Sequence, residues 1–190
     1  MIKNFILLIF FSFSFFSNKS DLKQVKYNFS TEPIDVIIPC TIKDKICLEK
    51  CINCIKEHGK NIRRIVVVSK TKLTNKAEWF DEEKFPFNFK EIAYELFKDE
   101  KKATNYLKSK KNRLGWLFQQ LIKFYAIYTI PNISSNVLML DADVIYLNHT
   151  SFINKKTNAA YLNRAKEHHP SYFEHGKRLI PGFYKVKKID

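Results

Sequence analysis

The sequence predicts an α/β fold with a central, mostly parallel sheet, and three apolar segments support that prediction. Residues 34–40 and 64–69 are apolar runs of strand length, and residues 44–58 between them suit a helix of about four turns. Strand, helix and strand make a βαβ unit, whose two strands run parallel. A third apolar run at residues 137–140 lacks helical spacing, which is typical of a strand buried on both faces.

Length and composition indicate one globular domain, and its charge suits an anionic partner or reflects a general bias toward Lys, Asn, Ile and Phe without any partner. The chain has 190 residues, 45% of them hydrophobic and 15% aromatic, and this excludes a disordered chain. The net charge of +14 favours nucleotides, acidic polymers or other anions as partners. Because the lysines are spread along the chain and an ammonium lacks the planar fork with which arginine reads bases, we expect no nucleic-acid partner.

The N-terminal residues are expected to lie outside the folded domain. Residues 5–16 form an apolar run after Lys3, which is typical of a signal peptide or a retained hydrophobic anchor. We therefore divide the chain into a signal or anchor (1–20), a polar linker (21–33) and a folded domain (34–190). This division predicts a membrane-associated or exported protein, with membrane attachment through residues 5–16; the alternative is a cytoplasmic protein.

The middle of the chain is expected to be mostly helical. Residues 79–89 are aromatic and acidic and contain Pro86, which predicts a loop with one helical turn, and residues 92–106 predict one helix. Residues 114–130 carry the strongest helical stripe of apolar residues, ended by Pro131. A second side of that helix either lines a pocket or is an ordinary exposed face; it carries Trp116, Gln119, Gln120 and Lys123.

All four cysteines lie early in the chain, at positions 40, 47, 51 and 54. The last three recur at helical spacing, so we expect them to be buried thiols that face the sheet rather than zinc ligands or disulfides.

The candidate site is the acidic pair Asp141 and Asp143, which follows the third apolar run directly. Open α/β sheets bind ligands at the carboxyl ends of their strands. Carboxylate oxygens suit Mg²⁺ or Mn²⁺, and both side chains can reach one ion in a turn after the strand. The alternative is that the two residues only form the turn.

The order of these segments resembles poorly characterised bacterial DUF-type proteins placed among the GT-A-fold nucleotide-diphospho-sugar transferases. The resemblance covers roughly residues 34–181 and rests on five stretches in order: Ile-Asp-Val-Ile-Ile-Pro-Cys, Ile-Val-Val-Val-Ser, Trp-Phe-Asp-Glu, Gly-Trp-Leu-Phe-Gln-Gln-Leu-Ile-Lys and Leu-Met-Leu-Asp-Ala-Asp-Val. It implies a GT-A-like α/β/α sandwich with a Rossmann-like nucleotide-binding half, and a glycosyltransferase (hexosyltransferase-like) activity on an unknown acceptor.

The resemblance also implies roles for individual residues. Asp141 and Asp143 would hold Mn²⁺ or Mg²⁺ on the diphosphate of the donor. Donor-binding residues would be Pro39, Cys40, Thr41, Ser69, Trp116, Gln120 and Lys123. His169 or His175 would either be a further metal ligand, contact the acceptor or belong to a histidine-rich surface loop. The resemblance gives no catalytic base and identifies neither the nucleotide nor the sugar.

Similar sequences continue well past the Tyr-Phe-Glu-His segment, whereas this chain ends at Asp190. We therefore expect a domain that is incomplete at its C-terminus, either active or retaining donor binding alone. Two other functions stay open. One is a haloacid-dehalogenase-like phosphatase with Asp141 as nucleophile and Asp143 as general acid. The other is a non-catalytic, basic, membrane-attached module that binds glycans or lipid head groups.

Overall fold

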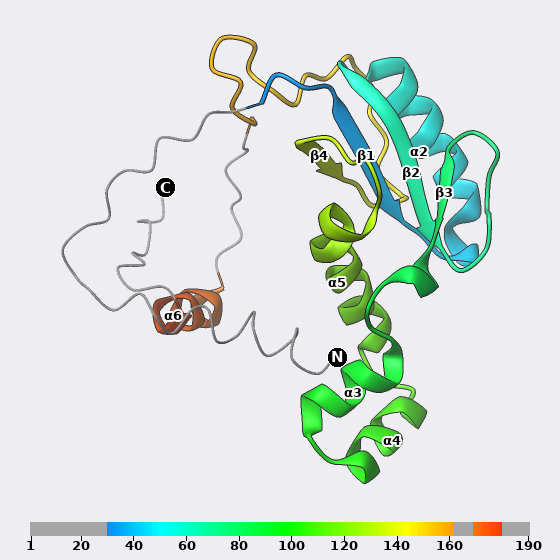
Figure 1. Ribbon diagram of the computed structural model, residues 1–190, viewed down its shortest axis with the longest axis vertical. Helices are drawn as coiled ribbons and strands as arrows, with labels where there is room; N and C mark the ends of the chain where they lie inside the picture. Colours follow the sequence, from blue (N-terminus) through cyan, green and yellow to red (C-terminus); the bar gives the residue numbers. More distant parts are fainter. Residues whose placement is uncertain (1–29, 162–168, 180–190) are drawn as a thin grey trace. The chain divides into compact units, whose positions relative to one another are not determined.

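A computed structural model describes residues 30–161 and 169–179 of the chain (Figure 1). Residues 30–161 belong to one compact unit, which holds every strand and all but one of the helices in the described part of the chain. Helix α6 (Pro170–Leu179) belongs to a second unit. It has no buried residue.

The centre of the first unit is a four-stranded sheet in which every neighbouring pair of strands is parallel. Its strand order is β3-β2-β1-β4. The strands are β1 (Ile34–Pro39), β2 (Ile62–Ser69), β3 (Glu78–Asp81) and β4 (Asn136–Met139). This sheet, flanked by helices, confirms the predicted α/β class and is compatible with a Rossmann-like fold.

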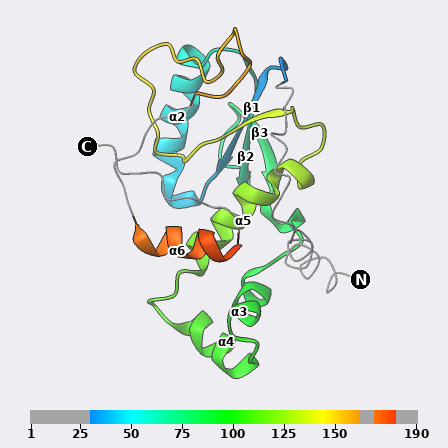
Figure 2. The same ribbon diagram turned by 90° about the vertical axis from the view of Figure 1, so that its left-hand side faces the viewer.

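Alternate residues of the two central strands pack on opposite faces of the sheet, as the period of a strand requires. Val36, Ile38 and Val67 pack against helix α2 (Lys45–His58), while Ile37 and Val66 pack on the side of helix α5 (Leu114–Thr129). Figure 2 shows α2 and α5 on different sides of the strands. Each fully buried aliphatic side chain contributes roughly 1.5–3 kcal/mol, so these two layers hold the sheet together.

The connection from β3 to β4 differs from the prediction of a single helix over residues 92–106. It contains a short 3-10 turn η2 (Glu82–Lys84), α3 (Phe89–Phe97), α4 (Glu100–Lys108) and then α5. The chain breaks between α3 and α4 because Lys98 adopts a left-handed conformation with φ of 50°. Asp99 then caps α4 by accepting a hydrogen bond from the backbone N–H of Lys102 at 2.9 Å.

Strand β3 corrects the prediction of a loop over residues 79–89. It pairs with β2 over four residues, and the indole Nε1 of Trp79 donates to the carbonyl of Ser69 at 3.0 Å. Its four residues are exposed or half-buried because β3 lies at the edge of the sheet, which is why the sequence shows no apolar run here.

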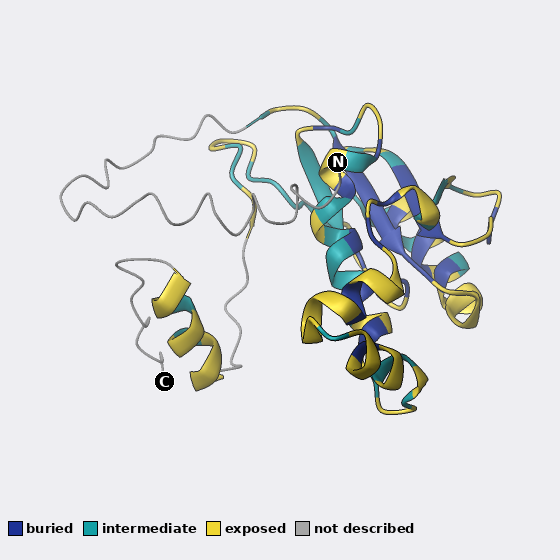
Figure 3. Cartoon of the chain, turned by 60° about the horizontal axis from the view of Figure 1, so that its bottom comes forward, coloured by how far each residue is buried: buried dark blue, intermediate teal, exposed yellow. Residues whose placement is uncertain are grey.

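Strand β4 corrects the expectation of a strand buried on both faces. All four of its residues are half-buried. Within residues 30–161 it pairs only with β1, from Ile34 opposite Asn136 to Ile37 opposite Met139. Figure 3 shows the contrast between the buried centre of the sheet and the largely exposed helices α3 and α4.

The cysteine prediction is confirmed in part. All four thiols are free, and Cys40 and Cys51 are buried. Cys54 is half-buried, and Cys47 is exposed, so Cys47 does not face the sheet as predicted. The first turn of α2 extends past the sheet core, since Lys45, Ile46 and Cys47 are all exposed.

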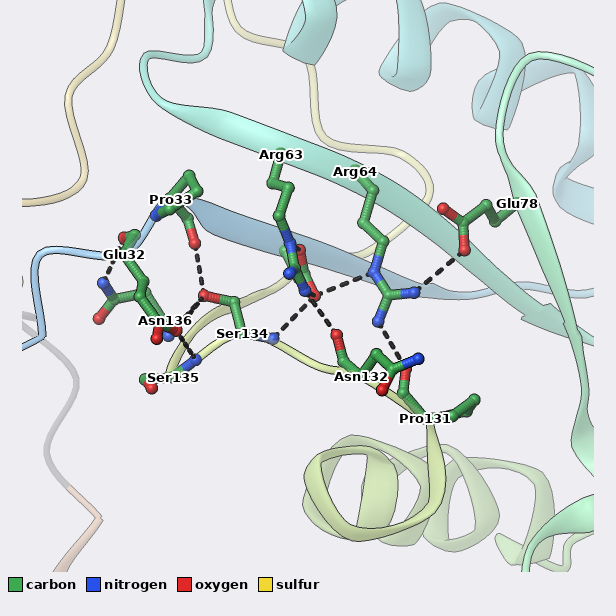
Figure 4. Close-up of polar contacts among 11 residues, drawn as sticks. Glu32, Pro33, Arg63, Arg64, Glu78, Pro131, Asn132, Ser134, Ser135 and Asn136 are labelled. Carbon is green, nitrogen blue, oxygen red and sulfur yellow. Dashed lines mark hydrogen bonds and ion pairs between the residues drawn. The ribbon is translucent and has the colours of Figure 1, made fainter.

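A buried carboxylate ties the starts of the central strands to the loop before β4 (Figure 4). Asp35 is completely buried. It accepts hydrogen bonds from Arg63 at 2.7 and 2.6 Å, from Arg64 at 3.0 Å and from the backbone N–H of Ser134 at 2.9 Å. Burial by itself would raise the pKa of Asp35, but these hydrogen bonds outweigh it and lower the pKa.

The localisation prediction requires correction. No helix in residues 30–161 and 169–179 is long and apolar enough to cross a membrane. The segment 5–16, on which that prediction depended, lies outside the described residues.

Candidate functional site

The candidate site lies where the carboxyl ends of β1 and β4 meet. Within the sheet, β2 and β3 lie on one side of β1, and the chain then returns to place β4 on the other side of β1. In open α/β sheets such a reversal of strand order leaves a crevice at the carboxyl ends of the two strands, where ligands bind. The backbone N–H of Leu140 donates to the carbonyl of Ile37 at 2.9 Å, which fixes Asp141 beside the end of β1.

Helix α5 supplies two polar side chains to Asp141. The ammonium of Lys123 lies 2.6 Å from Oδ1 of Asp141, and the amide Nε2 of Gln119 donates to the same oxygen at 3.3 Å. The side chain of Asp141 is 50% exposed and that of Lys123 is 21% exposed. The site therefore pairs a carboxylate open to solvent with a largely covered ammonium.

Gln119 and Lys123 reach the same carboxylate because residues four apart lie on one face of a helix. Gln120, which the sequence prediction assigned to the donor, is half-buried and has no hydrogen bond to Asp141 among the described contacts. Trp116 is 49% exposed, and its ring stacks under the guanidinium of Arg113 at 4.5 Å from the ring centroid. The structure thus brings Lys123 and Gln119 to Asp141, while donor binding by Lys123 and Gln120 stays a prediction.

Asp143 has different neighbours from Asp141. It is exposed, with the buried Ala142 between the two carboxylates. Its charge is one cause of the raised pKa of Cys51 on helix α2, after burial and the neighbouring Cys54. Among the described residues no contact joins the two carboxylates.

Helix α2 also contacts this edge of the sheet. The thiol of Cys51 donates to the backbone carbonyl of Asp141 at 3.7 Å. Burial chiefly raises the pKa of Cys51 to about 11 and that of Cys40 to about 12. Both thiols are therefore protonated at neutral pH and act as small packing groups rather than nucleophiles.

The predicted donor residues at the tip of β1 differ in their access to solvent. Pro39 and Cys40 are buried. Thr41 is exposed, and its hydroxyl donates to Oδ2 of Asp44 at 2.9 Å. Of these three, only the Thr41 side chain is open to a ligand.

Ser69 lies at the end of β2, next to the tip of β1 in the sheet, because Pro39 pairs with Val68. It is buried, and its hydroxyl donates to the carbonyl of Thr71 at 2.8 Å. This contact holds the loop after β2.

The two histidines predicted near the acceptor lie in or beside helix α6. His169 precedes the helix and its ring lies 5.0 Å from that of Tyr172; His175 is exposed within the helix. The segment is thus helical rather than a loop. Helix α6, and with it His175, belongs to a different unit of the chain from Asp141, as does His169.

The residues present suit one kind of metal site and not another. No group of three or more His, Cys, Asp or Glu side chains within residues 30–161 and 169–179 is arranged to hold a metal ion. Two carboxylates at a strand end fit an ion such as Mg²⁺ or Mn²⁺, which commonly takes one or two carboxylates and completes its shell with water and phosphate oxygens. They do not fit an ion enclosed by protein ligands alone.

Two features of the site were missing from the sequence prediction. The first is that Gln119 and Lys123 both contact Asp141. Their spacing of four residues was a usable signal, since it places both side chains on one face of the helix. The contact of Cys51 with the Asp141 backbone had no such signal, because it joins residues 90 positions apart.

Comparison of the chain with protein-family models, with curated proteins and with solved structures gives no match. The resemblance to GT-A-fold transferases therefore remains a prediction from the sequence.

Proposed function

We propose that this chain is glycosyltransferase-like and binds a nucleotide-diphospho-sugar donor with Mn²⁺ or Mg²⁺ at the carboxyl ends of β1 and β4. The observation that carries the proposal is the Asp141–Lys123 pair at the reversal of strand order. A metal–diphosphate ligand needs a carboxylate for the ion and a cation for the phosphate, and this pair provides one of each.

In this proposal each residue has a distinct role toward the donor. Asp141 and Asp143 would hold the ion, which when bound neutralises negative charge on the leaving nucleotide diphosphate. Lys123 would leave Asp141 and donate to a phosphate oxygen, while Gln119 keeps Asp141 oriented. Thr41 is the side chain at the tip of β1 that is open to the nucleoside or sugar. The sugar would pass from the diphosphate oxygen to an acceptor hydroxyl, whose base stays unassigned.

A calorimetric titration tests the proposal directly. UDP and GDP are titrated into the full chain with and without Mn²⁺. We expect saturable binding of one nucleotide that requires Mn²⁺ and is lost in Asp141→Asn and in Asp143→Asn. The matched control is Glu100→Gln, which removes the same charge from an exposed position in the first turn of α4.

The alternatives predict other results. Nucleotide binding that is absent or independent of Mn²⁺ would refute the proposal. Turnover of 4-nitrophenyl phosphate with Mg²⁺, abolished in Asp141→Asn, would assign the acidic pair to a haloacid-dehalogenase-like phosphatase instead.

A further inference from the structure

A cavity lies at the opposite end of the strands from Asp141. Its volume is about 460 Å³, within the range of small-molecule sites. It is bounded by the start of β1 at Ile34, the turn before β2 at Lys60 and Asn61, and the loop over residues 151–158 (orange in Figure 1). β1 separates this cavity from the candidate site by six residues, or roughly 20 Å.

Backbone hydrogen bonds fix the walls of this cavity. The N–H of Ile34 donates to the carbonyl of Asn61 at 2.8 Å, and the N–H of Lys60 donates to that of Thr150 at 3.0 Å. The loop closes on itself where the N–H of Asn158 donates to the carbonyl of Asn154 at 2.7 Å. The cavity is therefore held by main-chain contacts rather than by the side chains that line it.

The lining of the cavity is electropositive. Lys60 and Lys155 both line it, and none of its lining residues carries a carboxylate. Within residues 30–161 and 169–179, neither lysine forms an ion pair. Both lysines are exposed, and two lysines at one cavity without a neutralising acid favour an anion there.

The rest of the lining combines uncharged hydrogen-bonding residues with two apolar ones, Ile34 and Ile153. The hydrogen-bonding residues are Ser30, Thr31, Asn61, Ser151 and Asn158. Asn61 and Asn158 have positive φ angles of 62° and 55°, a conformation that asparagine tolerates better than most residues. Amides and hydroxyls bind hydroxyl groups of a ligand, and the cavity is larger than a phosphate ion requires.

We infer that this cavity binds a small phosphorylated polyol or sugar, with its phosphate between Lys60 and Lys155 and its hydroxyl groups against the asparagine and serine side chains. This site is independent of Asp141 and of the proposed donor. Its ligand carries a phosphate without needing a metal ion, since two ammonium groups supply the positive charge.

The test uses the ¹⁵N-labelled full chain titrated with inorganic phosphate and with glucose 6-phosphate, in metal-free buffer at fixed ionic strength. We expect saturable shifts of the Asn61 and Asn158 amide signals with both probes, and tighter binding of glucose 6-phosphate. The variant Lys60→Gln/Lys155→Gln should lose affinity at least about tenfold, because each lysine provides a charged hydrogen bond. The control Lys72→Gln removes a charge from an exposed residue in the loop after β2 and should bind like the wild type.

Three results would overturn the inference. The first is an unchanged affinity in the Lys60→Gln/Lys155→Gln variant. The second is a set of shifts spread evenly over lysine-rich surfaces, as expected for screening of a net charge of +14. The third is equal affinity for the two probes, which would refute the sugar part of the ligand.

Discussion

If the proposed function holds, replacing Lys123 by glutamine should change metal binding and nucleotide binding in opposite directions. In the free protein the Lys123 ammonium lies 2.6 Å from Asp141 Oδ1, so an ion that binds this carboxylate must displace it. The glutamine variant removes that competition and should bind Mn²⁺ alone more tightly. With nucleotide present, the variant lacks the cation that would contact the diphosphate and should bind UDP or GDP more weakly.

The magnitudes follow from the burial of the pair. Because Asp141 is half exposed, water screens the ion pair, and its net free energy is about 1 kcal/mol, at the upper end for exposed pairs. Removing it should raise Mn²⁺ affinity about fivefold. Loss of a charged hydrogen bond to phosphate should lower nucleotide affinity in the presence of Mn²⁺ at least about tenfold.

Both affinities can be measured on the same protein, Mn²⁺ by electron paramagnetic resonance and nucleotide by calorimetry. Lys101→Gln is the matched control, because it removes an equal charge from an exposed position on α4. A variant in which both affinities fall, or in which neither changes, would refute the exchange of Lys123 between carboxylate and phosphate.

Three further predictions concern stability and reactivity. Asp35→Asn should destabilise the fold by about 3 kcal/mol, measured by urea unfolding, because it leaves two guanidinium groups without their buried partner. Folding lowers the pKa of Asp35, so this carboxylate stabilises the fold above its unfolded pKa of about 3.8, and that stabilisation is lost as the pH falls below this value. A free energy of unfolding that stays constant below this pH in the wild type, or that follows the same pH dependence in the variant, would contradict this. Gly59→Ala should lower the free energy of unfolding by roughly 1–3 kcal/mol, because a Cβ at this position would lie 2.6 Å from the carbonyl oxygen of Ile55. A Cβ at Gly115 would meet no atom within 4 Å, so Gly115→Ala should leave the stability unchanged or raise it. Thiol reagents should modify exposed Cys47 well before buried Cys51, as peptide mapping would show; equal rates would contradict the burial and the raised pKa of Cys51.

Elements with a strong local pattern could be predicted from the sequence. The helix expected over residues 114–130 is α5, Leu114–Thr129, because its apolar residues recur at helical spacing and Pro131 stops it. The first strand and the helix after it were predicted to within about one residue for the same reason. Asp141 could be placed just past the end of a strand because an apolar run changes there to acidic residues.

Elements whose structure depends on distant contacts could not be predicted. β3 has no apolar run of its own and is a strand only because β2 pairs with it along one edge. The break between α3 and α4 depends on one left-handed residue, Lys98, which the helical pattern on either side hides. The buried state of Asp35 requires two arginines 28 and 29 positions away.

By itself, the sequence determined the class of the fold and the presence of a carboxylate pair at a strand end, since both are local consequences of residue type and spacing. The tertiary structure decided that β4 lies beside β1, and so placed Asp141 at the reversal of strand order. It also decided that Gln119 rather than Gln120 contacts this carboxylate together with Lys123. The physical reason is that strand order and helix rotation are set by burying both faces of the sheet at once, and that requirement is not local.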